Sequence, residues 1–196
     1  MTRRKSIIEV DRQKYEAKYI GKGQYSKAYR VGDRVVLYTK GDCAKEVLSL
    51  YQYNRMAHLP ELIQHDFIRG GQYGRGDLLW YVFSTPYYRN VTTKDKSAWE
   101  LMKCIIEYWN EFWRSERDYQ YQAYSRVHMN VEVMRKFVEF LKVNEIRRSV
   151  VKALQELVDI ANNCGNEVGF DFKKSNFGVN EYGTLIFRDV IWVFDK

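Results

Sequence analysis

Cysteine is scarce in this sequence, and its pattern excludes two classes of small protein. The 196 residues include three cysteines, which are odd in number and far apart: Cys43, Cys104 and Cys164. Such a pattern indicates neither a disulfide framework nor a zinc site, and we expect each cysteine to be a small core residue. The three histidines show no metal-ligand spacing either, so we expect structural roles for them.

Long apolar runs are missing, and prolines are few. No apolar run approaches the ~20 residues of a membrane span, so we expect no membrane partner. Residues 1–6 are basic but lack the hydrophobic stretch of a signal peptide, which predicts a cytoplasmic protein. With two prolines and 45% hydrophobic residues, the composition is that of a folded chain rather than a disordered one. The length allows one core of ordinary depth or two small lobes.

Positive charge and aromatic residues are what the sequence has in excess. The net charge is +7 and the aromatic fraction is 16%. A basic excess favours an acidic partner, which can be a nucleotide, a nucleic acid or an acidic protein surface. The charge alone does not choose among these partners.

Three polar residues near the C-terminus have a spacing with chemical meaning. Asn176 follows Asp171 by five residues, and Asp189 lies thirteen residues beyond Asn176. This is the register of the kinase signature H-R-D-x-x-x-x-N followed by D-F-G. There, one Asp orients the substrate hydroxyl, while the Asn and the second Asp hold magnesium against the phosphates. A turn over residues 180–183 can bring these positions together; the alternative is a surface hairpin whose polar residues cap turns.

A glycine-rich segment lies at the other end of the chain. Residues 18–31 read as a strand, a turn containing Gly21 and Gly23, and a second strand. Backbone N–H groups of such a turn can face an anion, so the loop can cover phosphates. No helix is predicted after the turn, which excludes a Rossmann or Walker loop.

These two segments carry a resemblance to a known family. The chain resembles a reduced protein kinase, and it is most similar to the early serine/threonine kinases of T7-type podophages. Ile20 to Tyr29 match their Ile/Leu-Gly-x-Gly-x-Tyr/Phe-Ser-x-Ala-Tyr loop, with Ser26 in place of the third glycine, and Phe170 to Asn176 match their Phe-Asp-x-x-x-x-Asn loop. Minimal kinases of bacterial type III effectors are a second comparison. The resemblance covers residues 18–40 and 165–190.

The resemblance implies an α+β, two-lobed protein kinase-like fold. Residues 1–86 would form a small N-lobe with a five-stranded antiparallel sheet and one helix, and residues 87–196 a truncated, mainly helical C-lobe. The local patterns agree with this order. Strand composition is found at residues 7–10, 17–20, 27–31, 34–39, 62–68 and 78–84, and helical patterns at 42–51, 97–124, 131–142 and 145–163.

The resemblance also implies roles for individual residues. Asp171 would orient the acceptor hydroxyl, and Lys173, placed as in serine/threonine kinases, would neutralise the transferred phosphate. Asn176 and Asp189 would hold Mg²⁺. The residues that would contact ATP are Gly21, Lys22, Gly23, Gln24, Tyr25, Ser26, Lys40, Glu46, Ser84 and Thr85. Ser84, Thr85 and Pro86 would form the hinge that binds adenine.

The lysine that pairs with the phosphates is hard to place in this sequence. The best alignment puts Leu37 or Thr39 at its position. Lys40 has the opposite parity, so a regular strand points it away from the nucleotide unless a bulge turns it. Lys22 or Lys27, in or beside the glycine loop, is the alternative.

Other departures from kinases concern substrate and regulation. The Asp189 motif reads Asp-Val-Ile, and Phe170 replaces the Arg that grips a phosphorylated activation loop. Seven residues follow Asp189, so we expect no activation segment and no switching by its phosphorylation. The aromatic stretch 108–114, continued by Tyr119, Tyr121 and Tyr124, is a candidate docking surface, or alternatively packs into the core.

The expected function is ATP-dependent serine/threonine phosphorylation of host proteins, in host takeover or counter-defence. The alternatives are a kinase-shaped protein that binds and inhibits a host factor without catalysis, a nucleic-acid binder, which the basic charge allows but does not favour, and a small-molecule kinase. The kinase hypothesis requires residues 21–26 and 171–189 to form opposite walls of one crevice.

Overall fold

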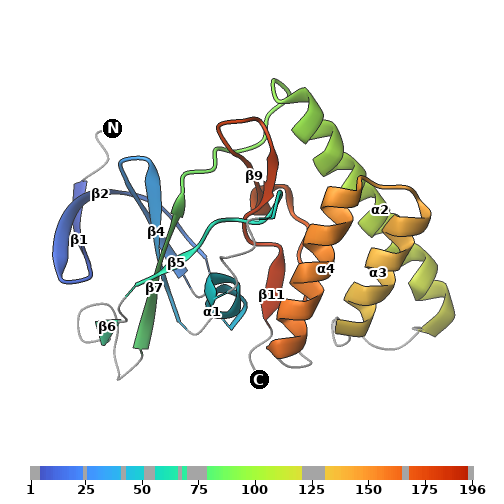
Figure 1. The fold of residues 1–196 in the computed structure, drawn as a ribbon, viewed down its shortest axis with the longest axis horizontal. Coiled ribbons are helices and arrows are strands. Elements are labelled where there is room, and N and C mark those ends of the chain that lie inside the picture. Colours follow the sequence, from blue (N-terminus) through green and yellow to red (C-terminus); the bar gives the residue numbers. More distant parts are fainter. Residues whose placement is uncertain are drawn as a thin grey trace. The chain divides into compact units, whose positions relative to one another are not determined.

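A computed structural model describes residues 5–23, 26–40, 43–50, 56–65, 68–69, 79–120, 131–164 and 168–193. The chain forms two compact units. The first comprises Met1–Tyr53 and Glu61–Tyr87, and the second comprises Asn54–Pro60 and Tyr88–Lys196. Figure 1 shows the elements of both units, and each unit is described by itself.

The first unit is an antiparallel sheet with one helix. Its elements are β1 (Lys5–Val10), β2 (Gln13–Lys22), β3 (Ser26–Val31), β4 (Arg34–Thr39), α1 (Cys43–Leu50), β5 (Ile63–Gln64), β6 (Ile68–Arg69) and β7 (Leu79–Pro86). The strand order is β1-β2-β3-β4-β7-β5, with β6 also paired to β7. Within the described residues the sheet thus has seven strands where a five-stranded sheet was expected, and the single strand predicted at residues 62–68 contains two two-residue strands, β5 and β6, which both pair with β7.

Tight turns connect the first four strands. Asp11 and Arg12 have φ values of 49° and 64°, the left-handed conformation that a two-residue hairpin turn of type I′ requires at both positions. Gly32, with a φ of 58°, turns the chain between β3 and β4 without a side-chain clash. Strands β1 to β4 therefore lie beside one another in the sheet in the order in which they occur in the sequence. Alternate residues of each strand face the same side of the sheet.

One face of this sheet carries the core of the first unit. Tyr38 on β4 donates a hydrogen bond from its hydroxyl to the carbonyl of Glu9 on β1, at 2.6 Å, so β1 and β4 meet although two strands separate them in the sheet order. Tyr29 packs edge-on against both Tyr19 and Tyr38. The buried residues of this cluster are Ile8, Val10, Ala17, Tyr29, Val36, Tyr38, Trp80 and Val82.

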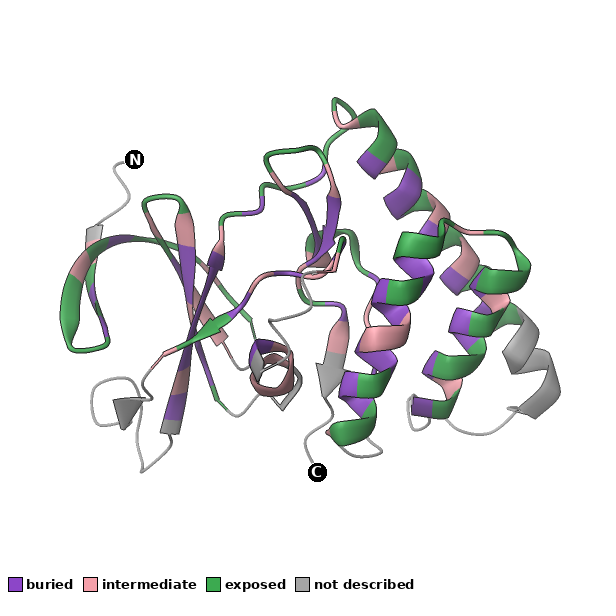
Figure 2. Ribbon diagram, viewed as in Figure 1, coloured by how far each residue is buried: buried purple, intermediate pink, exposed green. Residues whose placement is uncertain are grey.

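The second unit is mainly helical. Its elements are α2 (Lys96–Gln120), α3 (Val131–Val143), α4 (Arg148–Asn163), β8 (Val168–Phe170), the short 3-10 helix η1 (Lys174–Asn176), β9 (Phe177–Val179), β10 (Leu185–Phe187) and β11 (Ile191–Val193). Strand β9 pairs with β10, and β8 pairs with β11. Figure 2 shows that the buried residues of α3 and α4 lie along one side of each helix, as the 3.6-residue period predicts.

The fold class predicted from the sequence, α+β with an antiparallel sheet and one helix before a mainly helical part, is confirmed. The three long helices are also confirmed, with shifted ends. Helix α4 begins at Arg148 rather than Glu145, because Glu145 has a left-handed φ of 55° and belongs to the turn that ends α3. Residues 121–124 of the predicted second helix lie outside the described residues.

An aromatic cluster fills the core of the second unit. Trp109 and Phe112 of the aromatic stretch 108–114 are buried in it. These two residues therefore pack into the core, as one of the two hypotheses for this stretch expected, and do not form a docking surface. Tyr121 and Tyr124 lie outside the described residues. The cluster consists of Trp109, Phe112, Phe137, Phe170, Phe172, Phe177 and Phe187, joined by ring-to-ring contacts.

Two cysteines have described side chains. Cys104 is free and half-buried, and burial raises the pKa of its thiol. Cys164 takes part in a disulfide, which the odd count and wide spacing of the cysteines did not predict. Among the described helices, none combines the length and the apolar character that crossing a bilayer demands.

Candidate active site

Asp171 lies at the end of β8, between two buried phenylalanines. Phe170 is fully buried and Phe172 is 6% exposed, and their rings contact each other with centroids 4.8 Å apart. The backbone N–H of Asp171 donates to the carbonyl of Val190 at 2.7 Å. The alternation of the strand therefore directs both aromatic side chains into the core and holds the carboxylate between them at the surface, 24% exposed.

A compact polar cluster surrounds this carboxylate. Lys173 Nζ lies 3.0 Å from Asp171 Oδ2, and Asn176 Nδ2 donates to the same oxygen at 3.1 Å and to the Asp171 carbonyl at 2.9 Å. The backbone N–H of Asn176 bonds the carbonyl of Lys173 at 2.8 Å, which closes the η1 turn. The Lys173 side chain is 72% exposed, so its ammonium group can leave Asp171 for another anion.

Asp189 meets this cluster through the backbone. The N–H groups of Arg188 and Asp189 both point to the carbonyl of Asn176, at 2.8 and 3.3 Å. The hairpin between β9 and β10 returns the chain as predicted: Asn180 Oδ1 accepts from the N–H groups of Tyr182 and Thr184 at 3.1 and 2.8 Å. Asp171, Asn176 and Asp189 are thus brought together within the second unit.

The donor atoms of this cluster suit magnesium. Asn176 and Asp189 offer amide and carboxylate oxygens, the hard donors that Mg²⁺ prefers, and magnesium is commonly bound by one or two carboxylates together with substrate phosphates. No group of three or more His, Cys, Asp or Glu side chains in the described part of the chain is placed to hold a metal. Asn176 and Asp189 are the residues of this cluster that could hold a magnesium ion.

His58 supports the same hairpin from a distant part of the sequence. Its Nδ1 lies 2.8 Å from the Leu185 carbonyl and its Nε2 lies 3.1 Å from Ser149 Oγ, while its own carbonyl accepts from the N–H of Phe187 at 2.7 Å. Because a carbonyl only accepts, Nδ1 carries the proton and the neutral ring accepts from Ser149. The sequence predicted only that His58 is structural; its residue type gave no signal for these partners.

We expect His58 to make stability depend on pH. Burial lowers the pKa of its imidazole below the ordinary value, against the opposing effect of the Leu185 hydrogen bond. Below about pH 6.5 the unfolded chain therefore binds more protons than the folded chain. The free energy of unfolding should rise with pH up to that value, by at most about 1.4 kcal/mol per pH unit, and level off above it.

The variant His58→Asn isolates this contribution. Asparagine offers Leu185 an N–H donor, tolerates the positive φ of 77° at this position and does not titrate. Urea unfolding between about pH 5 and pH 8 should give a steeper pH dependence for the wild type than for the variant. Equal slopes would contradict the assignment.

The glycine loop lies in the first unit and is described in part. The N–H of Gly23 donates to the carbonyl of Ser26 at 2.9 Å, which closes a tight turn. The β2–β3 register shifts between Tyr19 and Gly21, so a bulge precedes the loop. Lys22 is exposed. The predicted residues Gln24 and Tyr25 lie outside the described residues.

Lys40 lies on the face that its parity predicted. The β3–β4 register runs without a shift up to the pair Ser26 and Thr39, so no bulge turns Lys40 inward. Its Nζ lies 5.3 Å from the Trp80 ring centroid, and Lys27 Nζ lies 5.5 Å from the same ring. In the described residues no ion pair joins Lys40 to Glu46. The face that carries Thr39 thus receives neither of these lysines.

The hinge expected at Ser84 to Pro86 is instead the last part of β7. Ser84 is paired with Val36 on one side and Ile63 on the other, and Thr85 is paired with Val35. Within the described residues Thr85 is paired on one side only, and the adenine-binding role expected of these residues stays a prediction. The strand ends at Pro86, which has no N–H to continue the ladder.

Ser84 belongs to a polar chain that the sequence did not predict. Its Oγ lies 2.7 Å from His65 Nε2, and His65 Nδ1 lies 2.6 Å from Asp11 Oδ2. The order is that of a hydrolase triad. However, Ser84 is 5% exposed in the middle of a paired strand, which closes its hydroxyl to a substrate. The hydrogen bonds of these three side chains instead connect the turn between β1 and β2 with β7.

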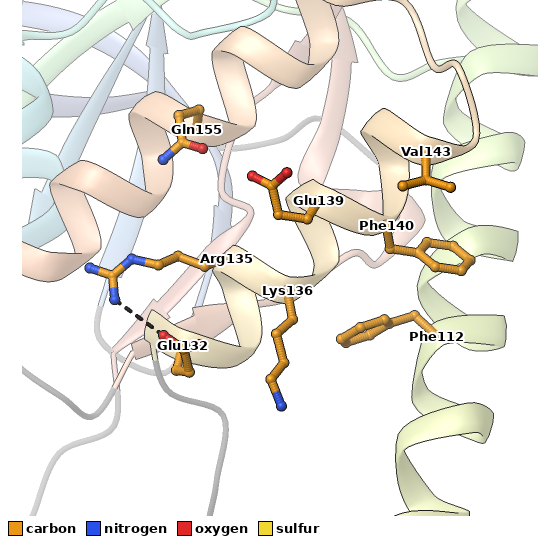
Figure 3. A pocket seen from close by; sticks show the side chains of 8 residues that line it. All are labelled: Phe112, Glu132, Arg135, Lys136, Glu139, Phe140, Val143 and Gln155. Atoms are coloured by element: carbon orange, nitrogen blue, oxygen red, sulfur yellow. Dashed lines mark hydrogen bonds and ion pairs between the residues drawn. The ribbon is translucent and has the colours of Figure 1, made fainter.

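A shallow groove on the helical unit contains none of the residues predicted to contact ATP, magnesium or the acceptor hydroxyl. Figure 3 shows its lining, with an ion pair between Arg135 and Glu132 at 3.3 Å and the rings of Phe112 and Phe140 at one side. The glycine loop and the Asp171 cluster belong to different units. Their placement on opposite walls of one crevice, and the roles of the site residues, stay predictions.

Comparisons with known proteins found little that is similar to this chain. No protein-family model and no curated protein matches it. Among solved structures, a crystal structure of spectinomycin phosphotransferase in complex with ADP and spectinomycin is similar, with 14% sequence identity and a TM-score of 0.37. The similarity covers 91% of this chain and 65% of that chain, so this chain spans less than two thirds of its length. The fold description rests on the elements themselves.

Proposed function

We propose that this protein is an ATP- and magnesium-dependent phosphotransferase with a kinase-like fold, acting on serine or threonine hydroxyls of host proteins. The observation that carries the proposal is the cluster of Asp171, Lys173 and Asn176, with Asp189 joined to it by the backbone. The order of elements supports it, because a sheet with a glycine turn precedes the helices and the Asp171 loop. The acceptor class rests on the resemblance at Lys173.

Each side chain has a task that its position supports. Asp171, half-buried and fixed by Asn176, would accept a hydrogen bond from the acceptor hydroxyl and orient it for attack. Lys173, exposed and paired with Asp171, would move to the transferred phosphoryl group and balance its charge. Asn176 and Asp189 would hold magnesium, which when bound supplies charge neutralisation at the phosphates.

A second candidate is a kinase-shaped protein that binds nucleotide or a host factor without catalysis. The positions of Lys40 and Lys27 favour it, since both ammonium groups lie over Trp80 and not on the face of Thr39. Kinases use a lysine from this strand to hold the α- and β-phosphates. Lys22 is the remaining lysine of the glycine loop that the sequence offered for this task.

One experiment separates the two candidates. Purified protein is incubated with γ-labelled ATP and Mg²⁺, with a host lysate as acceptor, and its melting temperature is measured with and without nucleotide. The kinase proposal expects label on itself or on host proteins, recovered as phosphoserine or phosphothreonine. Saturating nucleotide at about 100 times its Kd should stabilise the kinase, or a second candidate that binds nucleotide, by about 2.7 kcal/mol.

The outcomes are distinct. A melting shift without label transfer would favour the binding protein over the kinase. If the phosphoryl group of ATP is transferred to small molecules only, the acceptor is a small molecule and not a protein. The absence of both a melting shift and transfer would contradict the kinase and would leave, of the second candidate, only the form that binds a host factor without nucleotide.

A further inference from the structure

Arg188, which precedes Asp189, joins three segments of the second unit. Its Nη1 donates to the carbonyl of Tyr88 at 3.0 Å, and its Nη2 donates to Asn90 Oδ1 at 3.0 Å and to the carbonyl of Ser175 at 2.7 Å. One guanidinium group thus connects the segment after β7, the η1 turn and the end of the β9–β10 hairpin. A planar, five-donor group reaches acceptors in several directions, which a lysine ammonium on a flexible stem does not.

The strand beside Arg188 is shaped to receive it. A Cβ atom at Gly178 would lie 2.7 Å from Arg188 Cδ and 2.8 Å from Tyr88 Cβ. Both distances are shorter than the contacts that Cβ atoms make in proteins. The arginine stem therefore lies directly against the backbone of β9, where only glycine leaves room. The same strand is fixed to the Tyr88 segment, because the N–H of Val179 donates to the carbonyl of Arg89 at 2.9 Å.

The main chain at Arg188 completes this arrangement. Its N–H bonds the carbonyl of Asn176, the residue after Ser175, at 2.8 Å, and the N–H of Asp189 points to the same carbonyl at 3.3 Å. The side chain of Arg188 therefore holds one carbonyl of the η1 turn while its backbone holds the next. If Asp189 moved away from Asn176, the side-chain contact of Arg188 with Ser175 and its backbone contact with Asn176 would both break.

We propose that Arg188 is a positioning residue, which fixes Asn176 against Asp189 so that the two metal-binding side chains are ordered before a metal ion and nucleotide arrive. The inference rests on the proposed function for the identity of the ligand. Its physical basis is preorganisation: a site whose ligands are already ordered does not lose their conformational freedom on binding. Removing partners that orient metal ligands typically weakens metal binding 10- to 100-fold.

The test compares Arg188→Met, Arg188→Lys and a milder variant, Asn90→Ala, which removes one acceptor from the exposed loop. Arg135→Met is the matched control, since Arg135 also holds two partners, Glu132 and Asn162, but on α3. Binding of Mn²⁺ is followed by electron paramagnetic resonance in the presence of a non-hydrolysable ATP analogue. We expect Arg188→Met to weaken Mn²⁺ binding about 10-fold, Arg188→Lys nearly as much and Asn90→Ala less, with Arg135→Met unchanged.

Amide hydrogen exchange gives a readout that needs no ligand. If Arg188 orders the loop, the Asp189 amide should exchange about 10-fold faster in Arg188→Met and measurably faster in Asn90→Ala, while the amides of α3 and α4 keep wild-type rates. Unchanged exchange at Asp189 in the folded variants would overturn the inference. Absence of Mn²⁺ binding by the wild type would instead contradict the proposed function, and exchange would still decide the role of Arg188. If Arg188→Met does not fold, Asn90→Ala carries the test.

Discussion

Replacing Asp171 with asparagine is expected to lower the rate of phosphoryl transfer by roughly 10² to 10⁴-fold, the usual contribution of a positioned acid or base. Asparagine has the same shape and keeps the backbone bond from residue 171 to Val190. It removes the negative charge that attracts the acceptor hydroxyl and Lys173. Nucleotide affinity should change little, because the proposal gives the phosphates and the metal to other residues.

The matched control for this variant is Glu181→Gln. Glu181 is an exposed carboxylate in the turn between β9 and β10, and the same loss of charge there should leave transfer unchanged. Initial rates with γ-labelled ATP and melting curves are measured for both variants. If Asp171→Asn is folded and retains wild-type transfer, the catalytic role of Asp171 is wrong.

Replacing Phe170 with alanine is expected to reduce the free energy of unfolding by about 3–5 kcal/mol. Phe170 is fully buried, and its ring contacts those of Trp109, Phe137 and Phe172 at centroid distances of 6.0, 6.2 and 4.8 Å. Alanine would leave a cavity among aromatic rings, which collapse poorly because each is held by several neighbours. For a protein of ordinary stability this loss removes a large part of the total.

Two further variants accompany this prediction: one is a control at an exposed residue, and the other places a charge at the buried position. Tyr182→Ala, at a residue 84% exposed in the β9–β10 turn, should change stability by no more than about 0.5 kcal/mol. Phe170→Arg, the residue that the resemblance to kinases would place here, would bury an unpaired charge and should prevent stable folding. Urea unfolding measures all three variants. A loss below about 1 kcal/mol for Phe170→Ala would show that the aromatic core does not depend on this ring.

The sequence predicted those features that depend on residues close together in the chain. The helices follow from apolar spacing within each segment, and the return of the chain at Asn180 follows from local turn chemistry. The parity of Lys40 followed from strand alternation alone. The clustering of Asp171 with Asn176 is also local, since the η1 turn joins them.

Features that depend on distant partners were not predictable in the same way. His58 bonds Leu185 across 127 positions, and no pattern near either residue indicates it. The end of β7 was placed too early because Thr85 and Pro86 continue the strand by pairing with Val35 and Arg34 of β4, which are distant in the sequence. Arg188 was missed because an arginine beside an aspartate has no distinctive pattern; its partners are separated from it by 13 to 100 positions.

The assignment of Asn54–Pro60 to the helical unit has a consequence for dividing this protein. The chain passes between the units three times, after Tyr53, Pro60 and Tyr87, so no single cut separates them. A fragment that starts at Tyr88 would lack His58, and the N–H of Phe187 and the carbonyl of Leu185 would lose their partners beside a buried ring. Unmatched polar groups in an apolar interior oppose folding. Separate expression of the helical half would therefore need the short loop supplied as well, in trans or by a rearranged chain order.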